Sequence, residues 1–260
     1  MINPLKNIEK GMMREYSYSL LFHYLGYMFM QTLAVLGEGV RGPTLPDRLH
    51  EWIEPRREFA IWNNQIWIFE LFFVLILFSI FRRREAINYL RVGGLVSIIR
   101  GVFIFLTSLG PTDIFSNSQF IPDMSLTPEY LLNFYIPIGG IFFGEKTVFY
   151  LTQDLFFSGH TASTFLFLLI YDGTANSIFF HRHGDKSTVF LQNNSHKQRF
   201  FRNSIYKKID YIFILLLLFH LQTVFFLILT HEHYSIDILG AYFIVYAIYK
   251  FMRERNLLLN

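Results

Sequence analysis

The sequence predicts an all-α membrane protein, a bundle of six transmembrane helices with both termini in the cytoplasm. Of its 260 residues, 52% are hydrophobic and only 17% are charged, against about 25% charged residues in an average soluble domain. The apolar residues form blocks of about 20, which is the length needed to cross a bilayer. Short segments between the blocks hold nearly all the charge. This pattern excludes a disordered chain, disfavours a soluble one, and predicts a single membrane domain over residues 1–260.

Six blocks are long enough to span the membrane, and two of them, 61–81 and 211–230, contain uninterrupted apolar runs. Residues 131–151 are predicted to be re-entrant or interfacial, because a proline and two glycines interrupt them and Glu145 and Lys146 lie in the middle. No small-residue cleavage site follows the first block, so it is predicted to be a retained anchor. The predicted spans are 18–36, 61–81, 90–109, 155–178, 211–230 and 235–251.

The basic residues orient this bundle. Under the six-span topology, 17 of the 23 Lys and Arg residues lie in the segments on one side, 5 lie in the opposite loops, and Arg100 lies within a span. Positive charge stays on the cytoplasmic side, so both termini are predicted inside and residues 181–208 form a basic cytoplasmic loop. Topology therefore explains the net charge of +3 without a nucleic-acid partner. The chain has no Cys, which excludes disulfides and thiolate metal sites.

Two polar segments, 154–161 and 231–237, enter the fourth and sixth spans from the outer side, so the topology brings them to one face. In the second segment, His233 and Asp237 are spaced i, i+4 and share a helix face. A carboxylate in this position accepts the Nδ1–H of the imidazole and leaves Nε2 as a nucleophile or base. An isolated pair of this kind more often closes a helix end, but an ionisable pair at the edge of a span favours function.

The first segment contains Ser158, Gly159 and His160. Serine is a good N-cap, glycine permits close approach of a ligand to the backbone, and a helix N-terminus favours an anion such as phosphate. His160 would stand beside that anion as a proton donor or acceptor. A plain capped helix is the alternative, and a second histidine and a carboxylate on the same face count against it.

These motifs resemble those of the sphingomyelin synthases. Ser158-Gly159-His160-Thr161, with Asp154 before it, resembles the third family motif, and residues 231–237 with Ala241-Tyr242 resemble the fourth. Residues 43–47 are similar to the first motif, and the second is matched loosely by Arg100, Thr107, Leu109 and Pro111. The resemblance covers about residues 43–249 and places the chain in the type 2 phosphatidic acid phosphatase superfamily of lipid phosphatases and phosphotransferases. It departs from the family at residues 152–153, Thr-Gln, where Cys-Gly is usual.

The resemblance implies a phospholipid head-group phosphotransferase with its active site at the outer, lumenal or exoplasmic face. His233, oriented by Asp237, would attack the phosphorus of a glycerophospholipid, and His160 would protonate the leaving diacylglycerol. The phosphocholine or phosphoethanolamine group would then pass to ceramide or a related lipid alcohol. No metal or other cofactor is implied. The residues expected to bind substrate are Asp154, Ser158, Gly159, Arg100, Glu145 and Tyr234; for Arg100 and Glu145 a purely structural pairing is a comparable alternative.

Two further functions stay open. The same histidines would serve a lipid phosphatase or a phospholipase C-type hydrolase, in which water replaces the lipid acceptor. A non-catalytic membrane scaffold or transporter is the alternative of another class, although transporters usually carry internal repeats and none is visible. The location expected is the Golgi or plasma membrane in a eukaryote and the inner membrane in a bacterium. The head group, the acceptor and the oligomeric state are not predicted.

Overall fold

The computed structural model describes residues 4–38, 43–56, 58–107, 109–110, 112, 156–171 and 211–259. Every element in these ranges is an α-helix, which confirms the predicted all-α class for the described part of the chain. The helices are α1 (Pro4–Glu38), α2 (Arg48–Trp52), α3 (Glu58–Phe81), α4 (Arg83–Thr107), α7 (Gly159–Ile170), α10 (Tyr211–Thr230) and α11 (Ser235–Glu254).

Five helices are long and apolar enough to cross a membrane: α1 from Gly11 onward, α3, α4, α10 and α11. The chain therefore has the character of a multi-pass membrane protein. The predicted span 211–230 coincides with α10, and the predicted spans in α1, α3 and α11 lie within those helices. Helix α4 begins at Arg83, seven residues before the predicted span, so that Arg82 alone separates it from α3.

Helix α7 is shorter than the span predicted over 155–178. Ser158 caps its N-terminus, and its last helical residue is Ile170, because Tyr171 adopts an extended conformation. Its 12 residues rise about 18 Å, less than the hydrocarbon thickness of about 30 Å. The predicted re-entrant segment 131–151 and the predicted basic loop 181–208 lie outside the described residues.

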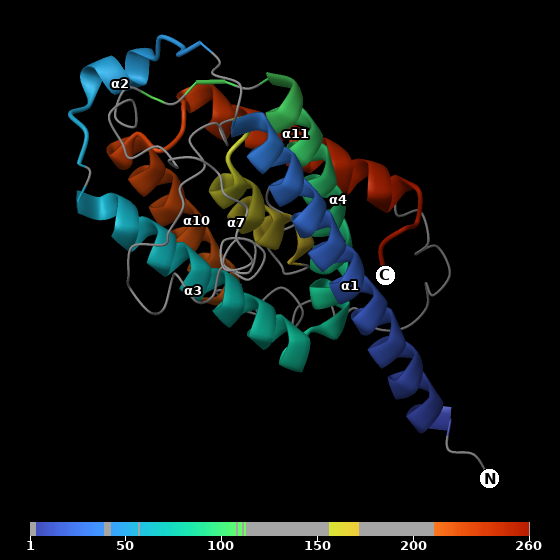
Figure 1. Ribbon diagram of the computed structural model, residues 1–260. Helices are drawn as coiled ribbons and strands as arrows, with labels where there is room; N and C mark the ends of the chain where they lie inside the picture. Colours follow the sequence, from blue (N-terminus) through green and yellow to red (C-terminus); the bar gives the residue numbers. More distant parts are fainter. Residues whose placement is uncertain are drawn as a thin grey trace, which may run out of the picture.

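Helix α7 occupies the middle of the bundle, where it contacts α3, α4, α10 and α11 (Figure 1). Its buried residues include Leu166 and Phe167, and the Phe167 ring stacks on that of Tyr89 in α4 with centroids 4.0 Å apart. Phe78 of α3 meets Phe167 edge-on, with centroids 5.6 Å apart. These apolar contacts hold α7 against α3 and α4 and so position the polar residues at its first turn.

Helix α1 packs along α4 through glycines. A Cβ atom on Gly26 would lie 2.5 Å from the carbonyl oxygen of Gly94, and one on Gly101 would lie 2.6 Å from Cα of Met30. The two backbones therefore approach more closely than any larger residue would permit. Small residues at helix contacts are typical of membrane bundles, where close packing replaces the hydrophobic effect.

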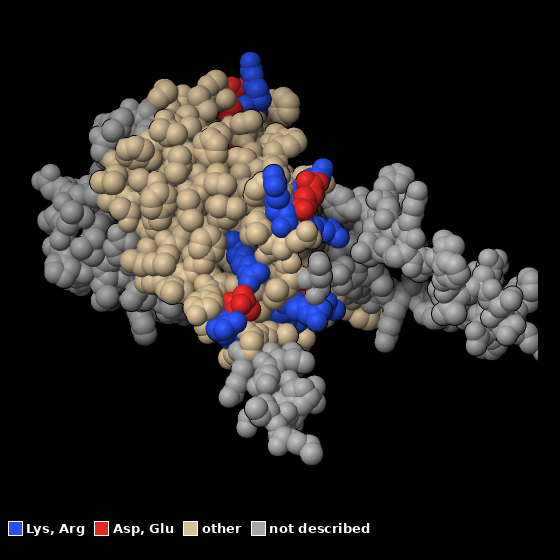
Figure 2. Space-filling model, turned by 90° about the vertical axis from the view of Figure 1, so that its right-hand side faces the viewer, with Lys and Arg blue, Asp and Glu red and all other residues tan. Residues whose placement is uncertain are grey.

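The outside of the bundle is largely apolar. Large side chains are exposed along the helices, among them Leu25, Phe69 and Phe225 at 53%, 61% and 60%. Figure 2 shows a broad face without charged residues, with Lys, Arg, Asp and Glu gathered near its margins. Such a surface is the one expected where helices face lipid.

Candidate active site

Two histidines from different helices face each other. His160 is the second residue of α7, and His233 lies two residues before α11. Their rings meet nearly edge-on, with centroids 5.9 Å apart and an interplanar angle of 67°. His233 is 6% exposed and His160 is partly buried, so the two imidazoles meet at a largely enclosed place.

Asp237 lies beside His233. The Nδ1 atom of His233 is 3.6 Å from Oδ2 of Asp237, which is an ion-pair distance and longer than a hydrogen bond. The same Oδ2 accepts a hydrogen bond from the backbone N–H of Tyr234 at 3.1 Å and so closes the first turn of α11. The Asp237 carboxylate therefore both caps the first turn of α11 and lies next to His233, so the structural and the catalytic interpretation of the His233–Asp237 pair apply together.

The N-terminus of α7 is joined directly to the start of α11. The Oγ atom of Ser158 accepts a hydrogen bond from the N–H of Thr161 at 3.2 Å, and the N–H of Ser158 donates to the carbonyl of Asp237 at 3.0 Å. The amides of Gly159 and His160 precede the first intrahelical hydrogen bonds. The helix dipole makes such a site favourable for an anion.

Arg100 lies against this helix start. It is 5% exposed, and its Nε donates to the carbonyl of Phe157 at 2.9 Å. Its Nη1 is 3.2 Å from Sδ of Met30 in α1. A Cβ atom on Gly159 would lie 3.2 Å from the Arg100 Cζ, so a larger residue would crowd the guanidinium. Arg100 thus anchors the segment before α7 and adds positive charge where the helix dipole is positive.

The structure adds three residues that the sequence analysis did not single out: Asn63, Asn64 and Glu232. The Oδ1 atom of Asn64 lies 2.8 Å from Nε2 of His160, and its Nδ2 donates to Oε1 of Glu232 at 2.7 Å. The Nδ2 atom of Asn63 donates to Oε2 of Glu232 at 2.7 Å, and the Thr230 hydroxyl donates to the same oxygen at 3.0 Å. Two adjacent asparagines near the start of an otherwise apolar span were the signal available in the sequence.

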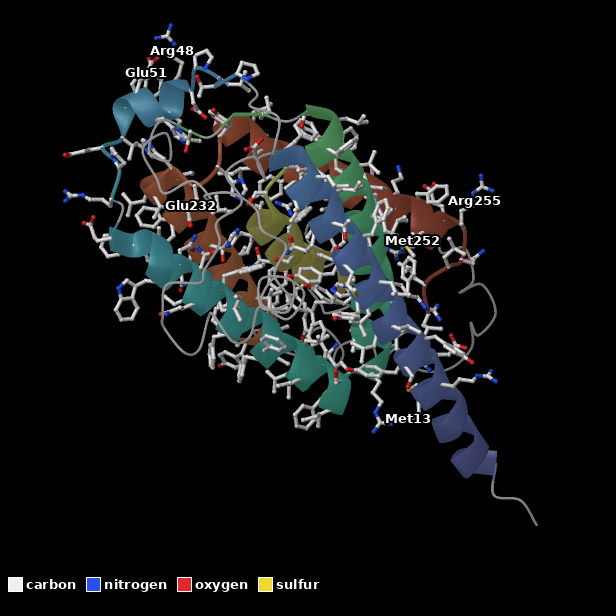
Figure 3. All side chains as sticks on the ribbon, viewed as in Figure 1. Met13, Arg48, Glu51, Glu232, Met252 and Arg255 are labelled. Carbon is white, nitrogen blue, oxygen red and sulfur yellow. The ribbon has the colours of Figure 1, made fainter. Side chains whose placement is uncertain are left out.

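Glu232 is an acid in an enclosed place. Figure 3 shows it inside the bundle between α2 and α10, whereas Arg48 and Glu51 on α2 point outward. Burial raises the pKa of the Glu232 carboxyl above its usual value, against the opposing effect of the hydrogen bonds from Asn63, Thr230 and Asn64 and the charge of His233. The hydrogen bonds therefore offset part of the cost of burying a charge on this carboxyl group.

The segments around Leu45 and Gly110 cover the His231–Tyr234 turn. The Tyr234 hydroxyl accepts a hydrogen bond from the N–H of Leu45 at 3.1 Å and donates to the carbonyl of Gly110 at 3.0 Å. The N–H of Gly110 in turn donates to the carbonyl of Pro43 at 2.9 Å. The regions that resemble the first, second and fourth family motifs thus meet at Tyr234, whose predicted role in substrate binding stays a prediction.

Asp47 and His50 fasten the segment 43–56, which lies between α1 and α3, to the same turn. Asp47 accepts hydrogen bonds from the backbone N–H groups of Ser235 and Leu49, and Nε2 of His50 lies 3.1 Å from the carbonyl of His233. The His50 ring stacks on that of His231 with centroids 3.9 Å apart. Burial opposes ionisation of Asp47, but the Ser235 hydrogen bonds, the charge of His50 and the Leu49 hydrogen bond together hold its pKa below the usual value.

Two of the predicted substrate-binding residues, Asp154 and Glu145, lie outside the described residues. Within the described ranges, no three His, Asp or Glu residues are grouped so as to hold a metal ion. The seven other predicted site residues lie around one end of α7: His160, His233, Asp237, Ser158, Gly159, Arg100 and, at the border, Tyr234.

No protein-family model matches this sequence, and a search of the curated proteins finds no match either.

Proposed function

We propose that this protein is a phospholipid head-group phosphotransferase that moves phosphocholine or phosphoethanolamine from a glycerophospholipid to ceramide or a related lipid alcohol. One observation carries the proposal: the rings of His160 and His233 face each other with centroids 5.9 Å apart, and Asp237 lies beside His233. The motif resemblance to sphingomyelin synthases supports the same reaction.

The chemistry follows from this arrangement. His233 attacks phosphorus through Nε2, and the carboxylate of Asp237 at Nδ1 stabilises the positive charge that develops on the ring. His160 gives a proton to the departing diacylglycerol oxygen and later takes one from the acceptor hydroxyl. The start of α7 and the guanidinium of Arg100 provide positive potential for the phosphoryl group.

The proposal includes six spans, cytoplasmic termini and an outer active site. The starts of α3, α7 and α11 carry the site residues, at the end of the bundle where α2 lies (Figure 1). The basic residues gather at the other end: Arg82 hydrogen-bonds the hydroxyl of Tyr171 at 3.3 Å, and Arg91 hydrogen-bonds the carbonyl of Leu257 at 3.0 Å. The distribution of positive charge supports placing that end in the cytoplasm.

The test uses purified protein in detergent with head-group-labelled phosphatidylcholine or phosphatidylethanolamine, each with and without ceramide. The expected result is label in a sphingophospholipid only when ceramide is present. His233→Gln abolishes the transfer, whereas the matched control His23→Gln retains it, because His23 packs between α1 and α4 with Nδ1 3.2 Å from the carbonyl of Leu90.

Each other outcome rejects a part of the proposal. Water-soluble label released regardless of ceramide identifies a hydrolase. Transfer that survives His233→Gln removes His233 as the nucleophile. The absence of any turnover with either lipid favours the scaffold or transporter.

A further inference from the structure

We propose that Asn64 and Glu232 are positioning residues that keep a proton on Nε2 of His160, so that Nδ1 of His160 exchanges the proton with the lipid oxygen. The inference deepens the proposed phosphotransfer function and rests on it. It concerns one atom of His160 and two residues, Asn64 and Glu232, to which the motif resemblance assigns no role.

The direction of the hydrogen bonds is set at the Glu232 end. A carboxylate only accepts hydrogen bonds, and Glu232 is met by three donors, from Asn63, Asn64 and Thr230. The amide nitrogen of Asn64 therefore faces Glu232. Its oxygen must then face His160, 2.8 Å from Nε2.

An amide oxygen accepts a hydrogen bond, so Nε2 of His160 must carry a proton. The reversed amide would place the Asn64 oxygen against the Glu232 carboxylate and lose a charge-assisted hydrogen bond. The second ring nitrogen, Nδ1, stands outside this network. Only Nδ1 can then gain and lose a proton while the network stays intact.

The ring itself is held by its neighbours. Trp67 packs against the His160 imidazole with centroids 4.2 Å apart, and its Nε1 donates to Oγ of Ser163 at 2.9 Å. Ser163 in turn donates to the backbone carbonyl of His160 at 3.0 Å. Asn63 is 1% and Glu232 is 8% exposed, so little water reaches these hydrogen bonds. A buried network in which each donor has an acceptor fixes a single arrangement.

The proton balance of the reaction agrees with this assignment. In the first step a bond forms between Nε2 of His233 and phosphorus, the bond from phosphorus to the diacylglycerol oxygen breaks, and that oxygen takes the Nδ1 proton of the His160 imidazolium. His160 is left neutral with its proton on Nε2. In the second step Nδ1 accepts the proton of the lipid hydroxyl as its oxygen displaces His233 from phosphorus.

The first experiment changes the direction of the network. In Glu232→Gln, the introduced NH₂ group faces Asn64 while its oxygen accepts from Asn63 and Thr230. We expect Asn64 then to turn its oxygen toward residue 232 and its NH₂ toward His160, at the loss of its hydrogen bond to the carbonyl of Ala60 at 3.1 Å. This turn moves the histidine proton to Nδ1. Adding Asn64→Asp restores an acceptor for Nε2–H, because the introduced carboxylate accepts from both His160 and the new amide.

Single-turnover release of the leaving group separates positioning from simple structural damage. The diacylglycerol of phosphatidylcholine leaves as a poor alkoxide that needs a proton, whereas the p-nitrophenol of p-nitrophenyl phosphocholine leaves as a stable phenolate. We expect Glu232→Gln to lower the rate of diacylglycerol release from phosphatidylcholine by about 100-fold, which is the size of a lost general-acid contribution. The rate with the p-nitrophenyl ester should fall far less. The double variant recovers the lipid reaction. Asn88→Leu, which removes a buried amide bonded to Leu259, is the matched control and alters the ratio of the two rates little.

Equal losses with both substrates, or no rescue by the double variant, overturn the inference. A second readout is independent of the transferase reaction: ¹⁵N NMR of histidine-labelled protein, with the His160 signals identified by their loss in His160→Gln. The inference requires the proton on Nε2 in the parent and the double variant, and on Nδ1 in Glu232→Gln. A parent with the proton on Nδ1 refutes it even if lipid transfer is observed. A proton on Nε2 without any lipid turnover rejects the proposed function alone.

Discussion

The glycine contact between α1 and α4 gives a prediction whose size follows from the structure. In Gly26→Ala the new methyl group would lie 2.5 Å from the carbonyl oxygen of Gly94 and 3.2 Å from its carbonyl carbon. The first distance is about 0.8 Å shorter than an ordinary carbon–oxygen contact. Both neighbours are backbone atoms, so no side-chain rotation relieves the overlap and the helices must separate.

Two effects of opposite sign decide the outcome. Alanine is favoured over glycine within a helix by about 1 kcal/mol, whereas overpacking costs about 1–3 kcal/mol. Gly11 on the same helix isolates the first effect, because a Cβ atom there meets nothing within 4 Å. Since both variants share the helix term, we expect Gly26→Ala to be less stable than Gly11→Ala by about 1–3 kcal/mol.

The assay is thermal unfolding of each variant in the same detergent, followed by tryptophan fluorescence. At about 2–4 °C per kcal/mol, Gly26→Ala should unfold roughly 2–12 °C below Gly11→Ala. Gly101→Ala, which places a methyl group 2.6 Å from Cα of Met30, should behave like Gly26→Ala. Equal midpoints for Gly26→Ala and Gly11→Ala would refute the close packing of α1 on α4.

Three further outcomes are expected. Tyr234→Phe leaves the buried carbonyl of Gly110 without its donor and should lower the free energy of unfolding by about 1–3 kcal/mol, measured as a lower thermal midpoint. The pKa of Asp47 is lower in the folded protein than its ordinary 3.8, so the Asp47 carboxylate stabilises the fold above pH 3.8 and this stabilisation is lost as the pH falls through the folded pKa. Asp47→Asn should remove this part of the acid dependence when the free energy of unfolding is measured against pH. An unchanged pH profile would contradict the prediction. Arg100→Leu removes the donor to the Phe157 carbonyl and should lower head-group transfer from labelled phosphatidylcholine more than Arg100→Lys does. Equal losses in the two variants would show that neither the charge nor the hydrogen bond of residue 100 contributes to transfer.

The helices were predictable wherever hydrophobicity alone defines them. Helix α10 has the predicted bounds because its apolar run stops at the polar turn that begins with His231. The end of helix α7 was not predictable, because the apolar run from 155 to 178 does not reveal that Tyr171 adopts an extended conformation and ends the helix. The early start of α4 was also hidden, since its first turn is rich in arginine, which hydropathy assigns to a loop.

The residues of the site divide in the same way. His160, His233 and Asp237 stand in short motifs with recognisable spacing, so local patterns indicate them. Asn64 and Glu232 acquire their importance only through contact with distant partners, because a hydrogen bond spanning 168 residues leaves no periodic trace in the sequence. Arg100 is recognisable in the sequence as a charge within a span, but its partner, the backbone carbonyl of Phe157, has no sequence signature.

The contacts of the loop between α1 and α3 constrain the order in which the protein can be completed during synthesis. The hydrogen bonds of Leu45, Asp47 and His50 join residues 189, 188 and 183 positions further along the chain. Each is made to residues 233–235, at the start of the last helix. On a ribosome that inserts helices in sequence, this loop reaches the membrane surface early and waits for its partners until the final span is made. A chain stopped before α11 would therefore present every described helix but the last with the site still open, and quality-control proteases would meet it in that state.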